Sequence, residues 1–304
     1  MEQRSRSRAS TEPIRHYTDG HIVDHGIGNA DIEILREFRY RRYHSAPYLA
    51  ALLGRHPVAM SRALRRLKVK GVDGLQLCEL QRTNVKDRTM GFLYYELGSE
   101  GYNVLNEEGI KMPEHKEDKQ FAHTLCLDQV MASIEIGIRQ QTEVTITYRE
   151  DLPRSLPLSP RDGKRRWMTS DHMPVTLTRN GKPRHIVGIE IETGANRLAK
   201  AVTKFKNIRE LIKSGTIEKY YGFGKQYFWL FVFRTEATKE SAMAELAIVM
   251  KDDPELCRHI LFKRHPIYGK SHDKPQPTGH MFTESWTRAG FPPLYLNGGE
   301  GARQ

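Results

Sequence analysis

A strand followed directly by a helix constrains the fold of this chain most. Residues 186–194 alternate branched apolar side chains with carboxylates, a pattern typical of a half-buried strand. Residues 195–204 then carry apolar side chains at helical spacing, together with lysines. A strand that ends in two carboxylates therefore leads into a basic helix.

A partner strand is expected over residues 170–178, just upstream. Asn180 and Gly181 follow it, and this dipeptide is the strongest short signal for a β-hairpin. If the hairpin forms, Asp171 reaches the same edge as Glu190 or Glu192. Two or three carboxylates would then gather at that edge.

Carboxylate oxygens are the ligands that Mg²⁺ or Mn²⁺ prefers, and a lysine nearby can help to hold a phosphate. The candidates are Asp171, Glu190 and Glu192 for the metal, with Lys200 or Lys204 for the phosphate. This combination suggests metal-assisted phosphodiester chemistry. The alternatives are structural: Asp171 as a strand-edge or turn residue, and the glutamates as a solvent-facing edge, since residues two apart share one side of a strand.

Composition favours a polyanionic partner. The chain has 304 residues, a formal net charge of +11 and a pI near 9.5, and its three cysteines show no Cys-x-x-Cys spacing. No apolar run is long enough to span a bilayer and the N-terminus lacks a signal peptide, so we expect a cytoplasmic protein that binds nucleic acid and no membrane. A disulfide framework or a structural zinc site is not supported.

The first third of the chain has the pattern of a winged helix-turn-helix. Residues 1–27 indicate a disordered basic arm, and residues 28–108 predict three short helices and then two strands. The third helix, from His56 to Gly71, has a basic face, where a recognition helix would contact double-stranded DNA. The candidate DNA-binding residues on this helix and in the turn between the strands are Arg55, Arg62, Arg65, Arg66, Lys68, Arg82, Lys86 and Arg88. The alternative is an ordinary basic surface helix beside a hairpin.

After a linker at 109–119, residues 120–262 predict a second domain. Its first helix carries His123, interpreted as a packed or capping histidine, and Glu135 near its buried side. Residues 150–166 are expected to form a loop rich in proline and arginine. The aromatic run at 227–233 indicates a buried central strand rather than a base-stacking platform. A further helix, a last strand and a C-terminal tail at 263–304 without regular structure follow.

The order of elements after the linker is helix, strand, hairpin, helix, strand, helix, strand. With acids at Asp171 and Glu190, this order resembles the core of the PD-(D/E)xK nuclease superfamily, an α+β fold of the restriction-endonuclease type. Together with the winged helix, Tyr95 to Gly101, His123 to Leu125 and Lys204, it is similar to the replication-relaxation (MobC-like) proteins of plasmids and other mobile elements. The resemblance covers roughly residues 30–250.

The resemblance implies a role for each matching residue. Asp171 would be the first metal-binding carboxylate, Glu190 the second, and Glu135 a further acid from the first core helix. The superfamily has a lysine two residues after the second acid, where this chain has Glu192. Three explanations stay open: a lysine of the next helix replaces it, Glu192 forms a different metal site, or catalysis has been lost.

Two functions follow from these expectations. In one, the winged helix binds duplex DNA and the second domain cuts or nicks it with Mg²⁺ or Mn²⁺ during replication or mobilisation of a plasmid or phage. In the other, the chain is a non-catalytic DNA-binding regulator on a nuclease-like scaffold. Winged-helix proteins often act as dimers, so a homodimer is left open.

Overall fold

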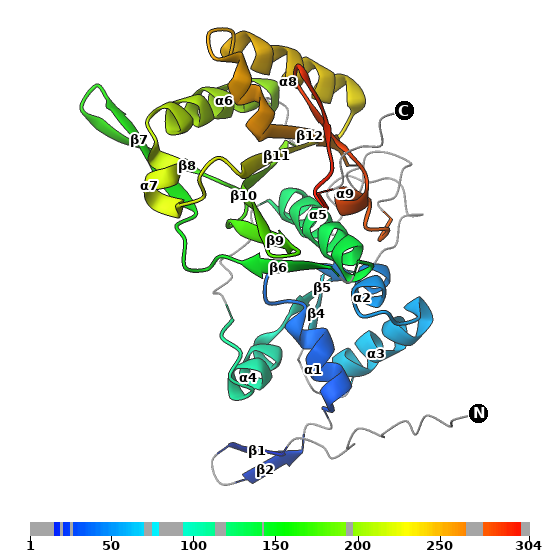
Figure 1. The fold of residues 1–304 in the computed structure, drawn as a ribbon. Coiled ribbons are helices and arrows are strands. Elements are labelled where there is room, and N and C mark those ends of the chain that lie inside the picture. The colour runs from blue at the N-terminus through cyan, green and yellow to red at the C-terminus, as the bar shows by residue number, and fades with distance from the viewer. Residues whose placement is uncertain are drawn as a thin grey trace. The chain divides into compact units, whose positions relative to one another are not determined.

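The chain forms two compact units with a mixed α+β fold. The computed structural model describes residues 15–18, 21–24, 27–69, 75–78, 94–112, 120–141, 143–192, 197–265 and 276–298 (Figure 1). The units are Met1–Asp118 and Lys119–Gln304. Among the described helices, none has the length and apolar character needed to cross a membrane.

The first unit combines short helices with a small antiparallel sheet in the order β3-β5-β4. Its helices are α1 (Asn29–Arg36), α2 (Ala46–Leu52), α3 (Pro57–Val69) and α4 (Ser99–Glu107). Its strands are β3 (His44–Ser45), β4 (Leu75–Cys78) and β5 (Tyr94–Leu97), together with the separate hairpin of β1 (Arg15–Thr18) and β2 (His21–Asp24). That hairpin lies within the arm for which the sequence predicts disorder.

Local sequence signals explain the helices of the first unit. Gly28 caps α1, and the carboxylate of Asp31 accepts a hydrogen bond from the Gly28 N–H at 3.2 Å. Ser45 precedes α2, which has a proline in its first turn. Helix α3 buries Met60, Leu64 and Leu67, which form an apolar stripe along the helix.

The second unit is built on a seven-stranded mixed sheet in the order β14-β13-β12-β11-β10-β9-β6. The first half of the unit consists of α5 (Phe121–Arg139), β6 (Val144–Tyr148), β7 (Ser155–Arg161), β8 (Lys164–Thr169), β9 (Val175–Arg179), β10 (Lys182–Glu192) and α6 (Arg197–Lys213). The second half consists of α7 (Thr216–Tyr221), β11 (Tyr227–Phe233), α8 (Glu236–Val249), the 3₁₀ helix η1 (Pro254–His259), β12 (Ile260–Arg264), α9 (His280–Thr283), β13 (Trp286–Arg288) and β14 (Phe291–Leu294).

Helices cover both faces of this sheet (Figure 1). One face packs against α6, α7 and α8, and the other against α5 and α9. Strands β10, β11 and β12 run parallel, so all three begin at one edge, the amino edge, and end at the opposite edge, the carboxyl edge. The aromatic run of β11 lies in the middle, where Phe231 packs on Phe205 of α6. This confirms the buried strand for the rings of Trp229, Phe231 and Phe233, whereas Phe228 near the start of the strand is only half-buried.

The predicted hairpin of β9 and β10 is confirmed. Arg179 pairs with Lys182 across the turn, and both turn residues have positive φ, 49° at Asn180 and 73° at Gly181. These values are those of a type I′ turn, which favours this dipeptide. Strand β10 is more deeply buried than the half-buried strand predicted, because β11 extends the sheet beyond it and helices cover both faces.

Two segments expected to be irregular are ordered, and the predictions for them were wrong. Residues 155–169 form the β7–β8 hairpin, whose turn at Asp162 and Gly163 has φ values of 51° and 72°. The C-terminal tail supplies α9, β13 and β14, because Phe282 and Trp286 are completely buried against the sheet. The second unit therefore extends past residue 262 to the end of the described chain.

Candidate active site at the carboxyl edge of the sheet

Two glutamates of β10 lie in the layer between the sheet and α6. Residues two apart on a strand point to the same face, and Glu190 and Glu192 pair with Phe231 and Phe233 of β11, whose rings belong to the core on the α6 side. Glu190 is 0% exposed and Glu192 is 3% exposed. This burial excludes the solvent-facing edge that the sequence left as an alternative.

Asp171 is held against the same strand. It lies in the loop between β8 and β9, ahead of the strand in which the sequence predicts it. Strand β9 pairs with β10 only as far as Ile186, so the next backbone groups of β10 are free to bond this loop. The Ile191 N–H donates to Asp171 Oδ2 at 2.9 Å, and the Ile189 N–H donates to Ser170 Oγ at 3.1 Å.

Gly188 allows this loop to approach closely. A β-carbon at this position would lie 2.6 Å from Ser170 Oγ and 2.7 Å from the Trp229 ring. Such distances are well below van der Waals contact, so any larger residue would push the loop away from the strand. The missing side chain of Gly188 therefore helps to place Asp171 beside Glu190.

Lys204 of α6 brings the three carboxylates together. Its Nζ lies 2.5 Å from Glu190 Oε2, 2.9 Å from Glu192 Oε1 and 3.8 Å from Asp171 Oδ2. Lys200, one turn earlier, is exposed and acts on Glu192 only through its longer-range charge. Of the two lysines that the sequence offered, Lys204 is the one at the site.

The carboxylates and the lysine shift one another's proton affinity. Burial raises the pKa of Glu190 to about 7, and Lys204 only partly offsets this effect. Burial also raises the pKa of Glu192. For Asp171, burial acts in the same direction, but the hydrogen bond to His123 and the Lys204 charge lower its pKa overall. Burial alone would lower the pKa of Lys204, yet the three carboxylates raise it.

His123 completes the site, and the sequence interpretation of it as a packed or capping residue missed this role. Its Nε2 lies 3.1 Å from Asp171 Oδ2, and this hydrogen bond raises the pKa of the imidazole. The two residues are 48 positions apart in the chain. No local pattern links His123 to Asp171, so only the packing of α5 on the sheet reveals the pair.

Glu135, the proposed third acid, is not brought to this site. It lies twelve residues after His123 on α5, roughly 18 Å along the helix axis. Its carboxylate accepts a hydrogen bond from the Tyr148 hydroxyl, and Arg139 Nη2 lies 3.5 Å from it. It therefore cannot ligate a metal together with Asp171.

The candidate DNA-binding residues of the first unit divide into two groups. Arg55 pairs with Glu33 and Arg66 pairs with Asp31, so both connect the region of α3 to α1. Arg62, Arg65 and Lys68 are exposed on α3, opposite its buried stripe. The predicted wing residues Arg82, Lys86 and Arg88 lie outside the described residues.

The carboxylate oxygens at the carboxyl edge suit a hard divalent cation, but the Lys204 ammonium already occupies the position between them. Apart from this ion pair, neither oxygen of Glu190 has a hydrogen-bond partner among the residues that the structure describes. In the described parts of the chain, no group of three or more His, Cys, Asp and Glu side chains is placed to hold a metal ion. A cation at Asp171 and Glu190 would therefore require the Lys204 ammonium to move aside.

Comparisons with models of protein families, with curated proteins and with solved structures found no match for this chain.

Proposed function

We propose that the chain is a DNA-binding protein of a mobile element whose second unit cuts or nicks DNA with Mg²⁺ or Mn²⁺. The observation that carries this proposal is the meeting of Asp171, Glu190 and Glu192 with Lys204 at the end of β10. A PD-(D/E)xK nuclease combines two acids and a lysine in one place. Here Lys204 of α6 would stand in for the lysine that Glu192 replaces in the strand.

Each residue has a distinct part in this chemistry. Asp171 and Glu190 would hold the cation, which when bound would polarise the scissile phosphate and acidify a water molecule. The Lys204 ammonium, once displaced from Glu190, would stabilise the charge that develops on the phosphate. His123 donates to Asp171 in its protonated form and keeps that carboxylate turned toward β10.

The first unit would bring duplex DNA to the protein as a winged helix. This proposal is supported by the order of the elements, three helices followed by an antiparallel pair of strands. It is also supported by Arg62, Arg65 and Lys68, which are exposed on the third helix. Binding through these cations should weaken steeply as salt is raised, because each phosphate contact releases counterions. The protein would act as a monomer or as a homodimer on the DNA.

Cleavage is tested with supercoiled and linear DNA in Mg²⁺, in Mn²⁺ and in chelator. We expect metal-dependent nicking that is lost in Asp171→Asn and Glu190→Gln. Glu240→Gln is the matched control, because it removes one exposed carboxylate of α8 that is not among the three around Lys204. Nicking that survives both site variants would contradict the assignment of the active site.

A second candidate function is favoured by the ion pairs themselves. Lys204 already pairs with the two buried carboxylates, so the cluster is compatible with a structural role in a non-catalytic DNA-binding regulator. In that case the protein would bind DNA in the presence of Mg²⁺, Mn²⁺ or chelator, and it would cut DNA under none of these conditions. Arg62→Ala with Arg65→Ala should weaken DNA binding under either proposal, whereas Lys111→Ala, an exposed lysine elsewhere in the unit, should not.

A further inference from the structure

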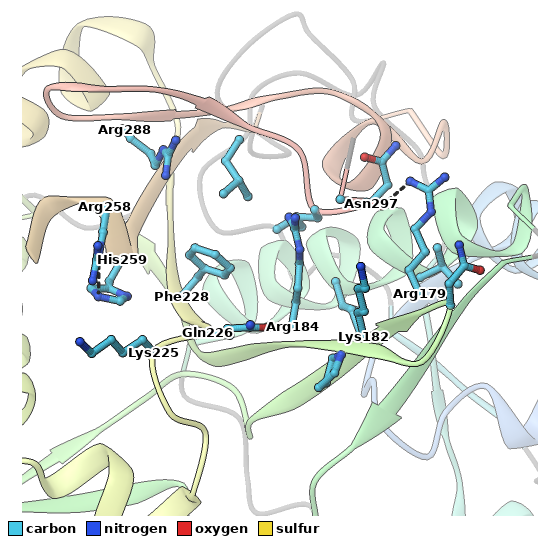
Figure 2. Close-up of a pocket in the computed structure, with 17 residues that line it drawn as sticks. Arg179, Lys182, Arg184, Lys225, Gln226, Phe228, Arg258, His259, Arg288 and Asn297 are labelled. Atoms are coloured by element: carbon cyan, nitrogen blue, oxygen red, sulfur yellow. Dashed lines mark hydrogen bonds between the residues drawn. The ribbon is translucent and has the colours of Figure 1, made fainter. Parts of the chain in front are cut away.

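A cavity of about 700 Å³ opens at the amino edge of the sheet, at the opposite end of β10 from the candidate active site (Figure 2). It lies beside the β9–β10 turn, the starts of β11 and β12, and the β13–β14 segment. Arg184 lines the cavity, and Glu190 lies six positions later on the same strand. In an extended chain this spacing corresponds to a distance of roughly 20 Å. The cavity is therefore a separate site.

Its described lining is strongly basic. The charged side chains are Arg179, Lys182, Arg184, Lys225, Arg258 and Arg288, and among the described residues no aspartate or glutamate lines the cavity with them. Arg179 is also paired with Glu143, which lies outside the lining. Six cations around one cavity repel one another, so an anion that enters it would relieve this repulsion.

Carbonyl oxygens orient the guanidinium groups of Arg184 and Arg288 without neutralising them. Arg184 Nη1 donates to the Tyr295 carbonyl at 3.0 Å, and Arg288 Nε donates to the Pro292 carbonyl at 2.7 Å. Burial lowers the pKa of both arginines, and a neighbouring arginine lowers each further. Their remaining N–H groups are available to a ligand in a fixed orientation, which suits bidentate binding of phosphate.

An aromatic ring lies among these cations. Figure 2 shows Phe228 between Arg184 on one side and Arg258 with His259 on the other, with Arg288 above it. Phe228 is half-buried. A flat apolar ring surrounded by arginines offers a stacking surface for a base beside binding groups for phosphate.

We propose that this cavity binds a nucleotide through its phosphate groups, with the base against Phe228. The ligand chemistry is the same for a free nucleoside polyphosphate and for the phosphorylated end of a nucleic-acid strand. The proposal does not depend on DNA cleavage, because the cavity shares no residue with the carboxyl-edge cluster.

Binding can be measured by titration calorimetry of the full chain at low salt with ATP, inorganic tripolyphosphate and a 5′-phosphorylated tetranucleotide. We expect saturable binding that weakens about tenfold in Arg184→Gln and in Arg288→Gln, since each loses a charged donor pair. Lys225→Gln changes an exposed side chain, so a folding defect would not explain its weaker binding. Arg165→Gln, with the same charge change on the exposed face of β8, should stay within about twofold of wild type.

The relative affinities of the three ligands distinguish a free nucleotide from the phosphorylated end of a nucleic-acid strand. ATP stronger than tripolyphosphate supports a free nucleotide, and a tetranucleotide stronger than ATP supports a strand end. Equal loss in Arg165→Gln and in the cavity variants, or no saturable binding of any ligand, would overturn the proposal. Asp171→Asn should bind as wild type, so a protein that binds nucleotide without cutting DNA would refute only the cleavage proposal.

Discussion

The two ends of β10 differ in charge and in how that charge is balanced. At the carboxyl edge, three carboxylates meet Lys204 at distances of 2.5 to 3.8 Å. At the amino edge, six cations line the cavity without a described carboxylate among them. The carboxyl-edge site contains its own cation, whereas at the amino edge Arg179 pairs with Glu143, which lies outside the lining.

This difference indicates which ligand each edge can accept at low cost. A cation entering the carboxyl edge must first displace an ammonium that is already in contact with the carboxylates. An anion entering the amino edge displaces no charged partner. Ligand affinity in the first site is therefore reduced by the strength of the internal ion pairs, whereas in the second it is increased by repulsion among the arginines.

The largest effect is expected from Lys204→Met, which leaves the buried carboxylates without a cation. Removing one partner of a buried ion pair typically costs about 4 kcal/mol in the free energy of unfolding, measured by urea denaturation. Lys206→Met, an exposed lysine on the same helix, is the control and should change stability little. Mg²⁺ should restore part of the loss in Lys204→Met. If Mg²⁺ has no effect there, the carboxylates do not form a metal site.

The pH dependence of stability should reveal Glu190. Its pKa is about 7 in the folded chain against 4.5 as the ordinary value, so the folded state binds the proton more tightly. The contribution of Glu190 to stability is then fully present below pH 4.5 and is lost, by about 3 kcal/mol, as pH rises through 7. The raised pKa of His123 acts in the same direction.

Urea denaturation measures this contribution of Glu190 to stability when wild type and Glu190→Gln are compared at several pH values between about 5 and 8. The variant should lose most of the slope, and Glu240→Gln should retain it. Parallel curves for wild type and Glu190→Gln would show that the folded protein does not hold this proton. The lowered pKa of Asp171 acts oppositely, but only in more acidic solution.

Gly188→Ala tests whether the two edges are independent. The added methyl group would collide with Ser170 and Trp229, at a cost of about 2 kcal/mol for overpacking. Because Ser170 precedes Asp171, we also expect reduced DNA cleavage. Nucleotide binding at the amino edge, measured by calorimetry on the same preparation, should stay within about twofold. A parallel loss of both activities would show that the edges are coupled through β10.

The smallest effect is expected from Lys225→Gln. Removing one exposed cation from the basic cavity should stabilise the free protein at low salt by about 0.3 kcal/mol, and added salt should abolish the gain. Thermal unfolding at two salt concentrations measures this difference. A destabilised variant would indicate that the lysine has a favourable partner in the cavity.

Local patterns determined a large part of this fold. The type I′ turn at Asn180 and Gly181 needs only two residues that tolerate positive φ, and the same rule at Asp162 and Gly163 would have found the β7–β8 hairpin. The burial of α3 along one face and the burial of β11 can likewise be predicted from the sequence, because one has an apolar stripe and the other a continuous aromatic run. Trp286 is also completely buried, but it lies in a tail rich in proline and glycine that gave no periodic signal.

By itself, the sequence determined that acids and lysines would surround one strand end, because a strand and its hairpin partner are adjacent in the chain. Only the tertiary structure decided which of them meet. It selected Lys204 over Lys200, added His123 and separated Glu135, since these depend on how α5 and α6 pack on the sheet. The basic cavity also needed the fold, because it joins side chains from Arg179 to Arg288 that share no local pattern. Contacts between distant segments follow from packing, which local periodicity does not encode.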